Sequence, residues 1–266
     1  MRNMIRLLTA VGVLLVFVGF TRGAQMNKTY VLVHGAWQAA WAWDHVRSKL
    51  IADGAEVIVV NLPSHGDDQT PVTGVTLNMY RDALVHAIGD RKDVILVGHS
   101  FGGTVISTVA EAVPQRIAKL VFVAAFMPLN GETSLALSGV EQNKTSLLGS
   151  NLVFDDAKNP TKVGVKESSL VDIYCADCSA SNKALVFERR KAEALGPLAT
   201  PVSLSEKNYG SVPRYYVETL KDKAVSHPFQ EWMIGRNPVK QRFQLNTSHC
   251  PSLSQPDKLS AILLGL

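Results

Sequence analysis

The sequence predicts an α/β fold in which a mostly parallel sheet is flanked by helices, and three observations predict it. Short apolar runs alternate with helical patterns from residue 30 onward. The first four runs are nearly continuous in apolar residues, which is typical of parallel strands that are buried on both faces. A polar segment, about residues 130–208, interrupts the alternation before it resumes for two more strands.

The composition indicates a globular protein. The chain has 266 residues, of which 46% are hydrophobic and 19% are charged. A chain of this length and composition builds a large apolar core, which excludes disordered, collagen-like and coiled-coil proteins. Only one apolar run approaches the length of a membrane span, so a polytopic membrane protein is excluded as well.

Residues 1–23 have the pattern of a secretory signal peptide. Two arginines flank the start of the apolar run from Leu7 to Phe20, and a polar segment follows in which Thr21 and Gly23 are the small residues before the cut. As a helix this run would span about 21 Å, less than the roughly 30 Å of a hydrocarbon core. We expect cleavage after Gly23 and a secreted or periplasmic mature chain of residues 24–266. The alternative is an uncleaved leader that anchors the protein to the membrane.

The leader also explains most of the net charge. It carries three arginines and no acidic residue, so the net charge falls from +4 for the full chain to about +1 for the mature one. No basic stripe interleaved with aromatic residues follows, so neither nucleic acid nor, after cleavage, a membrane is expected as a partner. A small molecule is the expected partner, and the sequence is compatible with either a monomer or a homodimer.

The predicted strands and helices alternate along the chain. Four strands are predicted from continuous apolar runs between turn residues, at 30–33, 56–60, 93–97 and 120–124, and two more, at 214–219 and 241–245, follow the polar segment. The helices have apolar residues at three- and four-residue spacing, at 41–52, 77–88, 102–112, 184–195, 228–234 and 257–264. Parallel strands joined by helices need right-handed crossovers, so the helices should cover both faces of the sheet.

The polar segment is expected to form a mainly helical cap, because it is inserted into one connection before the last two strands. It contains Cys175 and Cys178, whose spacing is compatible with a small disulfide or with two separate thiols. A metal site is not expected, because no second pair of Cys or His ligands follows at the spacing of a zinc site.

The sharpest motif is Gly98-His-Ser100-Phe-Gly102, between a predicted buried strand and a predicted helix. A G-x-S-x-G in this context is a nucleophile elbow, a tight turn that exposes the serine hydroxyl above the edge of the sheet. The two glycines let the strand and the helix pass closely. The start of the helix directs its free N–H groups toward the serine. Ser100 is therefore the predicted nucleophile.

Serine needs a base to accept its proton, and the base needs an acid to orient it. In folds with this elbow the acid and then the histidine follow the serine in the chain. His227 and His249 both follow Ser100, but His227 opens a predicted helix, whereas His249 lies in a loop just after the last strand. We therefore predict His249 as the base.

The acid is expected near the end of the preceding strand. Glu218 falls inside that strand, whereas Asp222 lies in the turn beyond it, from which it reaches a neighbouring loop, so Asp222 is preferred. The oxyanion formed during attack needs two N–H donors. We expect them from Phe101, the residue after the nucleophile, and from Ala36 in the loop after the first strand, where Gly35 lets the backbone turn close to the site.

These motifs resemble the α/β-hydrolase superfamily and, within it, the plant methylesterase and hydroxynitrile lyase family with its bacterial esterase relatives. Besides the elbow, the matching segments are residues 30–37, 41–43, 120–128, 209–216, 229–233 and 248–252. The resemblance implies an α/β-hydrolase fold with a mostly helical cap over the pocket. It also implies a triad of Ser100, Asp222 and His249, with Ala36 and Phe101 as oxyanion donors.

Two departures from this family bear on the reaction. Lyase members have Thr at the position of Gly35 and Lys after the catalytic His, where this chain has Cys250. The lysine holds the departing cyanide, and a neutral cysteine does not replace it, so a hydroxynitrile lyase is not expected.

The leading hypothesis is therefore a serine hydrolase that cleaves a small carboxylic ester through an acyl-enzyme, without a cofactor. A lactonase or an amidase would use the same residues, and a hydrolase fold that binds a small ligand without turnover is the rival from another class. Trp37, Phe101 and Phe126 are candidate pocket residues, with ordinary core packing as the alternative. Cys250 either lines the site or fills space beside it.

Overall fold

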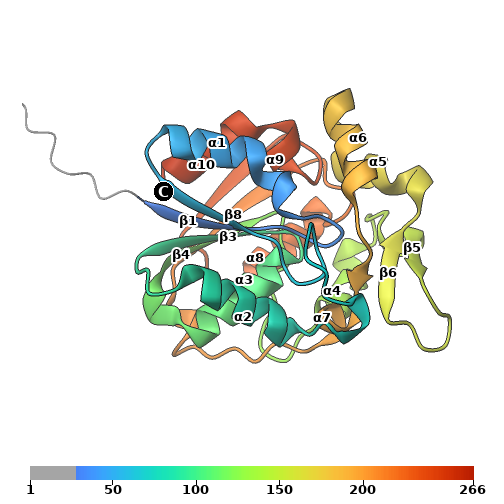
Figure 1. The fold of residues 1–266 in the computed structure, drawn as a ribbon, viewed down its shortest axis with the longest axis horizontal. Coiled ribbons are helices and arrows are strands. Elements are labelled where there is room, and N and C mark those ends of the chain that lie inside the picture. Colours follow the sequence, from blue (N-terminus) through green and yellow to red (C-terminus); the bar gives the residue numbers. More distant parts are fainter. Residues whose placement is uncertain (1–27) are drawn as a thin grey trace, which may run out of the picture.

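The computed structural model describes residues 28–266 as three layers, with a sheet between two layers of helices (Figure 1). The six strands pair in the order β2-β1-β3-β4-β8-β9, and every pairing is parallel. The strands are β1 Thr29–Val33, β2 Glu56–Val60, β3 Val94–His99, β4 Ile117–Val123, β8 Arg214–Thr219 and β9 Gln241–Leu245. The predicted leader lies outside the described residues.

Helices cover both faces of the sheet, which confirms the predicted fold class. One layer holds α1 (Asp44–Ala52), α9 (Pro251–Ser254) and α10 (Pro256–Leu264). The other holds α2 (Leu77–Ile88), α3 (Gly102–Ala112) and α8 (His227–Arg236). The expected helix at 41–52 is divided, because residues 40–43 form a 3₁₀ turn before α1 begins.

The sheet has an apolar core on each side, which explains its unbroken apolar strands. Along β1, Tyr30 and Leu32 pack into the core under α1 and α10, while Val31 and Val33 pack into the core under α2 and α3. Side chains alternate between the two faces of a strand. Both faces are covered here, so residues 30–33 of the strand are all apolar.

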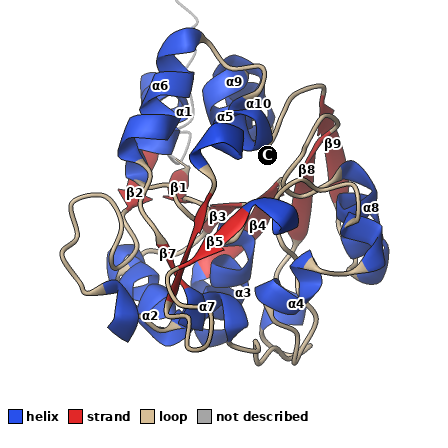
Figure 2. Cartoon of the chain, turned by 90° about the vertical axis from the view of Figure 1, so that its right-hand side faces the viewer, coloured by secondary structure: helices blue, strands red, loops and turns tan. Residues whose placement is uncertain are grey.

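The cap lies between β4 and β8 and contains both helices and a small sheet. Its helices are α4 (Ser134–Ser138), α5 (Glu167–Cys175), α6 (Ala180–Arg189) and α7 (Leu195–Ala199). Its strands β5 (Leu152–Phe154), β6 (Lys162–Val165) and β7 (Glu193–Ala194) form an antiparallel sheet. Figure 2 views the molecule from this side, with β5 and β7 in front of β3 and β4.

The structure corrects one element of the cap and settles the pairing of two cysteines. The helix expected over residues 184–195 ends at Arg189, and residues 193–194 pair with β6 as strand β7. A contact with a distant strand thus overrides the local helical pattern. Cys175 and Cys178 are joined by a disulfide at the end of α5.

A buried polar cluster attaches β7 to the main domain. Glu193 of the cap is 1% exposed, and its carboxylate contacts the ring Nε2 of His65 at 3.0 Å and accepts a hydrogen bond from the Tyr80 hydroxyl at 2.8 Å. Burial alone would lower the pKa of His65, but the charge and the hydrogen bond of Glu193 outweigh it, so the pKa is raised. The cap is therefore held to the domain by a buried His65–Glu193 pair in which the charged form of the ring is favoured.

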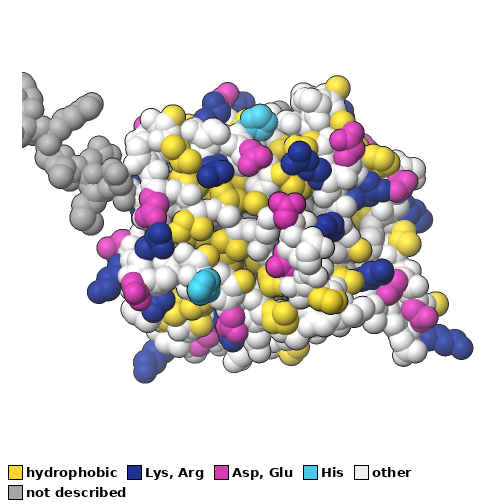
Figure 3. Space-filling view, in the orientation of Figure 1, with side chains coloured by type: hydrophobic (Ala, Val, Ile, Leu, Met, Phe, Trp, Pro, Cys, Tyr) yellow, Lys and Arg dark blue, Asp and Glu magenta, His cyan; other side chains and the backbone are white. Residues whose placement is uncertain are grey.

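The surface carries charges of both signs. On the face shown in Figure 3, basic and acidic side chains are interspersed around small apolar areas. Among residues 28–266, no helix has the length and hydropathy needed to cross a membrane.

Replacing Glu193 by Gln should destabilise the protein by about 3–5 kcal/mol at pH 6, because the protonated His65 would lose its buried partner. A histidine whose pKa is higher in the folded than in the unfolded protein stabilises the folded state. This stabilisation is complete at pH values below the pKa of the unfolded protein and is lost as the pH rises through the pKa of the folded protein. The difference between wild type and Glu193→Gln, measured by urea unfolding, should therefore shrink from pH 6 to pH 9. A difference that stays constant or grows would contradict the ion pair.

Candidate active site

The predicted elbow is built where β3 meets α3. β3 ends at His99, α3 begins at Gly102, and Ser100 between them has a φ of 53°, a left-handed conformation that is strained for a residue with a side chain. A Cβ on Gly98 would lie 2.6 Å from the carbonyl oxygen of Gly102, and a Cβ on Gly102 would lie 2.7 Å from the carbonyl oxygen of His34. Both positions therefore require glycine, as the motif predicts.

Asp222 and His249 are brought together although 27 residues separate them in sequence. Oδ2 of Asp222 lies 2.8 Å from Nδ1 of His249, and both side chains are fully buried. The carboxylate also accepts hydrogen bonds from the Thr219 hydroxyl and from the N–H groups of Ala224 and Val225, each at 2.8 Å. These donors hold the carboxylate in place. The proton of the ring is thereby directed to Nδ1, which leaves Nε2 free to accept.

The loop that carries His249 lies against the elbow. The ring of His99, the residue before Ser100, contacts the carbonyl oxygen of His249 through Nε2 at 2.8 Å, and the two rings are 4.6 Å apart. Within residues 28–266, Nε2 of His249 is buried without a hydrogen-bond partner, and no hydrogen bond joins it to Ser100. Such a bond is often long in a free enzyme and shortens when substrate binds.

The loop after β1 approaches the elbow so closely that only glycine fits at position 35. A Cβ there would lie 2.7 Å from Cβ of Ser100. Burial lowers the pKa of His34 to about 3, so its ring is neutral. The neutral ring donates from Nδ1 to the carbonyl of Gly35 at 2.8 Å and accepts from the N–H of Leu62 at 3.2 Å. The loop that carries Ala36 is thus held rigidly beside Ser100.

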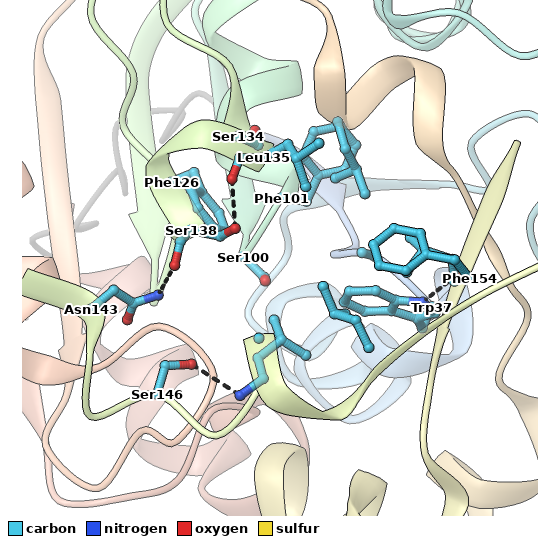
Figure 4. Close-up of a pocket in the computed structure, with 16 residues that line it drawn as sticks. Trp37, Ser100, Phe101, Phe126, Ser134, Leu135, Ser138, Asn143, Ser146 and Phe154 are labelled. Carbon is cyan, nitrogen blue, oxygen red and sulfur yellow. Dashed lines mark hydrogen bonds between the residues drawn. The ribbon is translucent and has the colours of Figure 1, made fainter. Parts of the chain in front are cut away.

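A cavity lies above Ser100, between the domain and the cap. Figure 4 shows the Ser100 hydroxyl pointing into it, with Trp37 and Phe154 on one side and Phe126 on the other. The lining residues carry no formal charge and are mostly apolar. They are Ala36, Trp37, Ser100, Phe101, Phe126, Ser134, Leu135, Ser138, Asn143, Ser146, Leu148, Gly149, Leu152, Phe154, Val163 and Leu198.

The sequence matches the alpha/beta hydrolase family over residues 30–262. Methylesterase 7 of Arabidopsis thaliana is 32% identical over 250 residues, which cover 90% of this chain and 96% of that protein. The chain is an alpha/beta hydrolase of the methylesterase family. The putative chloroplastic methylesterase 13 of the same plant is 36% identical over 249 residues. That match covers 90% of this chain but only 56% of the relative's length.

A solved structure agrees with this assignment. The crystal structure of polyneuridine aldehyde esterase superposes on this hydrolase with a TM-score of 0.81 and 25% sequence identity. The match covers 90% of this chain and 98% of that one. The elbow, the sheet and the cap described above are therefore elements of a shared fold.

The alternative acid and base of this hydrolase form a separate cluster. Glu218 accepts two hydrogen bonds from Arg242, at 2.8 and 2.7 Å, and contacts Nε2 of His227 at 3.0 Å. Glu218, His227 and Glu231 are close enough to share a metal ion. Both carboxylate oxygens of Glu218 are already bound by Arg242, however, so the cluster is better explained as an ion-pair network than as a metal site.

Three of the four pocket candidates proposed from sequence line the cavity, and the fourth does not. Trp37, Phe101 and Phe126 are lining residues. Cys250 is corrected: it is fully buried outside the lining, and its Sγ lies 3.0 Å from the amide of Gln38. The lining residues of the cap, such as Leu135 and Phe154, were missed, because no periodic pattern in that segment tells which side chains face the serine.

Replacing Gly98 by Ala should destabilise this hydrolase by about 1–3 kcal/mol or more, because the added Cβ would overlap backbone atoms that cannot move aside. Thermal unfolding measures this loss. The matched control is Gly235→Ala, at an exposed helical position where an added Cβ meets nothing within 4 Å. The control should be neutral or slightly stabilising. Equal melting temperatures for the two variants would show that the elbow does not need its glycine.

Proposed function

We propose that this hydrolase cleaves a small carboxylic ester through an acyl-enzyme formed on Ser100. The observation that carries the proposal is the buried 2.8 Å contact between Asp222 and His249, in a loop packed against the strained turn that exposes Ser100 to the cavity. The names of the relatives, methylesterases and an esterase, support ester hydrolysis as the reaction.

The geometry supports a definite role for each residue. Asp222 holds the proton of His249 on Nδ1, so Nε2 accepts the proton of Ser100 as Oγ attacks the ester carbon. The carbonyl oxygen becomes an oxyanion, to which Ala36 and Phe101 present their N–H groups. Removing one such donor typically costs about 3–4 kcal/mol of transition-state stabilisation. The imidazolium then protonates the departing alcohol, and water hydrolyses the acyl-enzyme by the same steps.

The cavity favours an uncharged substrate. Its lining has aromatic and aliphatic side chains and no charged group, so an ionic substrate would lose its hydration without gaining a partner. Lactones and amides would use the same residues, and a ligand-binding protein without turnover remains the rival class. The position of Cys250 argues against a hydroxynitrile lyase, because its thiol is bound to Gln38 outside the cavity.

We also propose that the protein is exported. The basic and apolar pattern of residues 1–23 is that of a secretory leader. The Cys175–Cys178 disulfide fits an oxidising compartment such as the periplasm or the cell exterior.

Replacing Ser100 by Ala should abolish turnover of a short-chain chromogenic ester while the protein stays folded. The reason is that no other hydroxyl would occupy the position of the nucleophile. Initial rates and circular dichroism on the purified protein test this. A fluorophosphonate probe should label the wild type and not the variant. Unchanged turnover in the variant, or an unlabelled wild type, would refute the proposal and favour the ligand-binding alternative.

Replacing Asp222 by Asn should lower kcat by about 10⁴-fold, the size of effect that the wrong tautomer has in a serine-protease triad. An amide would donate to Nδ1 of His249, so the ring proton would move to Nε2. The control is Glu218→Gln, which changes the other acidic side chain at the end of the same strand. Its kcat should stay close to that of the wild type. A larger loss for Glu218→Gln than for Asp222→Asn would reverse the assignment of the acid.

A further inference from the structure

Three buried side chains connect the loops around the proposed base. Gln38 comes from the loop after β1, His99 from the elbow and Cys250 from the loop after β9, and each is at most 3% exposed. In the structure Oε1 of Gln38 lies 3.1 Å from Nδ1 of His99, and Nε2 of Gln38 lies 3.0 Å from Sγ of Cys250. Nε2 of His99 lies 2.8 Å from the carbonyl oxygen of His249. The contacts therefore form one continuous chain from the thiol to the backbone of His249.

The positions of the protons in this chain follow from its chemistry. A carbonyl oxygen only accepts, so the proton of His99 is on Nε2. Burial, with the neighbouring His249 as a smaller cause, holds the pKa of His99 well below its usual value, so the ring is neutral and its Nδ1 must accept. The partner at Nδ1 must then be a donor.

Gln38 supplies that donor when its NH₂ group faces the ring. With the amide oxygen toward Nδ1, two acceptors would oppose each other, and a half-turn of the amide removes this conflict. The oxygen then faces Sγ of Cys250, and burial raises the pKa of this thiol, so it keeps its proton. In this arrangement each contact of the chain joins one donor to one acceptor.

We infer that His99 is a positioning residue for His249, oriented by a hydrogen-bond chain that runs from the Cys250 thiol through the Gln38 amide to the His249 carbonyl. The inference rests on the proposed function of His249 as the base. Asp222 orients the ring of His249. His99 fixes its backbone against the elbow.

The neutral state of His99 also suits the proposed reaction. The centroids of the two imidazole rings are 4.6 Å apart, and His249 becomes an imidazolium when it takes the proton of Ser100. A second cation at that distance would oppose this step. A carboxylate at position 38 would stabilise a charged His99, whereas the amide of Gln38 does not. The residue type at position 38 thus keeps the second ring neutral.

Imidazole ¹⁵N NMR of the folded protein tests the arrangement of protons directly. The wild type should show His99 as the neutral Nε2–H tautomer at pH 7. Gln38→Leu removes the donor to Nδ1, but the His249 carbonyl still requires the proton on Nε2, so the ring should stay in the Nε2–H tautomer and the Nδ1 resonance should move to that of a ring nitrogen without a hydrogen bond. Gln38→Glu should convert the ring to an imidazolium. A wild-type His99 that is charged, or protonated on Nδ1, would overturn the inference. This measurement does not require turnover, so it separates failure of the inference from failure of the proposed ester hydrolysis.

Kinetics test the positioning role. Gln38→Leu should lower kcat about tenfold, because a slightly misplaced base transfers protons poorly. Its KM should change little, because Gln38 does not line the cavity. Cys250→Ala should lower kcat, and Cys250→Ser, which restores a donor, should recover most of the loss. Melting temperatures establish that each variant is folded. A folded Gln38→Leu protein with wild-type kcat, or equal losses for Cys250→Ala and Cys250→Ser, would overturn the inference.

Discussion

The close approach of β3, α3 and the loop after β1 is the constraint on which the rest of the site depends. Ser100 adopts a left-handed backbone at the point where three chain segments come within contact of one another. Glycine is required at positions 35, 98 and 102, because a side chain at any of them would overlap a neighbouring segment. This packing exposes the hydroxyl above the sheet and places the Ala36 backbone beside it. The apolar cores on both faces of the sheet hold the strained turn in place.

The cap is more than a cover over the cavity, because it contacts each loop that carries a proposed functional residue. The Trp37 indole, next to Ala36, donates to the carbonyl of Val163 in β6 at 2.7 Å. Asp177, within the disulfide-closed turn, accepts hydrogen bonds from Thr247 and Ser248, just before His249. With the buried Glu193 pair, these contacts make the cap part of the framework that positions the site.

Buried histidines take different charge states according to what they contact. His34 and His99 contact backbone carbonyls, and burial keeps both rings neutral. His65 contacts the carboxylate of Glu193, which overcomes the effect of burial and favours the charged ring. The same side chain is thus a neutral hydrogen-bonding group beside the elbow, whereas under the cap a carboxylate partner favours its charged form. In each case the group that the ring contacts helps to set its charge state.

The sequence by itself determined the alternating strands and helices and the elbow, and it was enough to propose Asp222 and His249 as acid and base. These follow from local features: the periodicity of apolar residues, glycines at fixed spacing and the order of residues along the chain. Only the tertiary structure decided the small sheet of the cap, the end of α6 and the partners of Glu193 and Cys250. Glu193 meets His65 across 128 positions and Cys250 meets Gln38 across 212. Such pairings depend on how the completed layers pack, and a polar residue in the sequence carries no signal of which distant group it will meet.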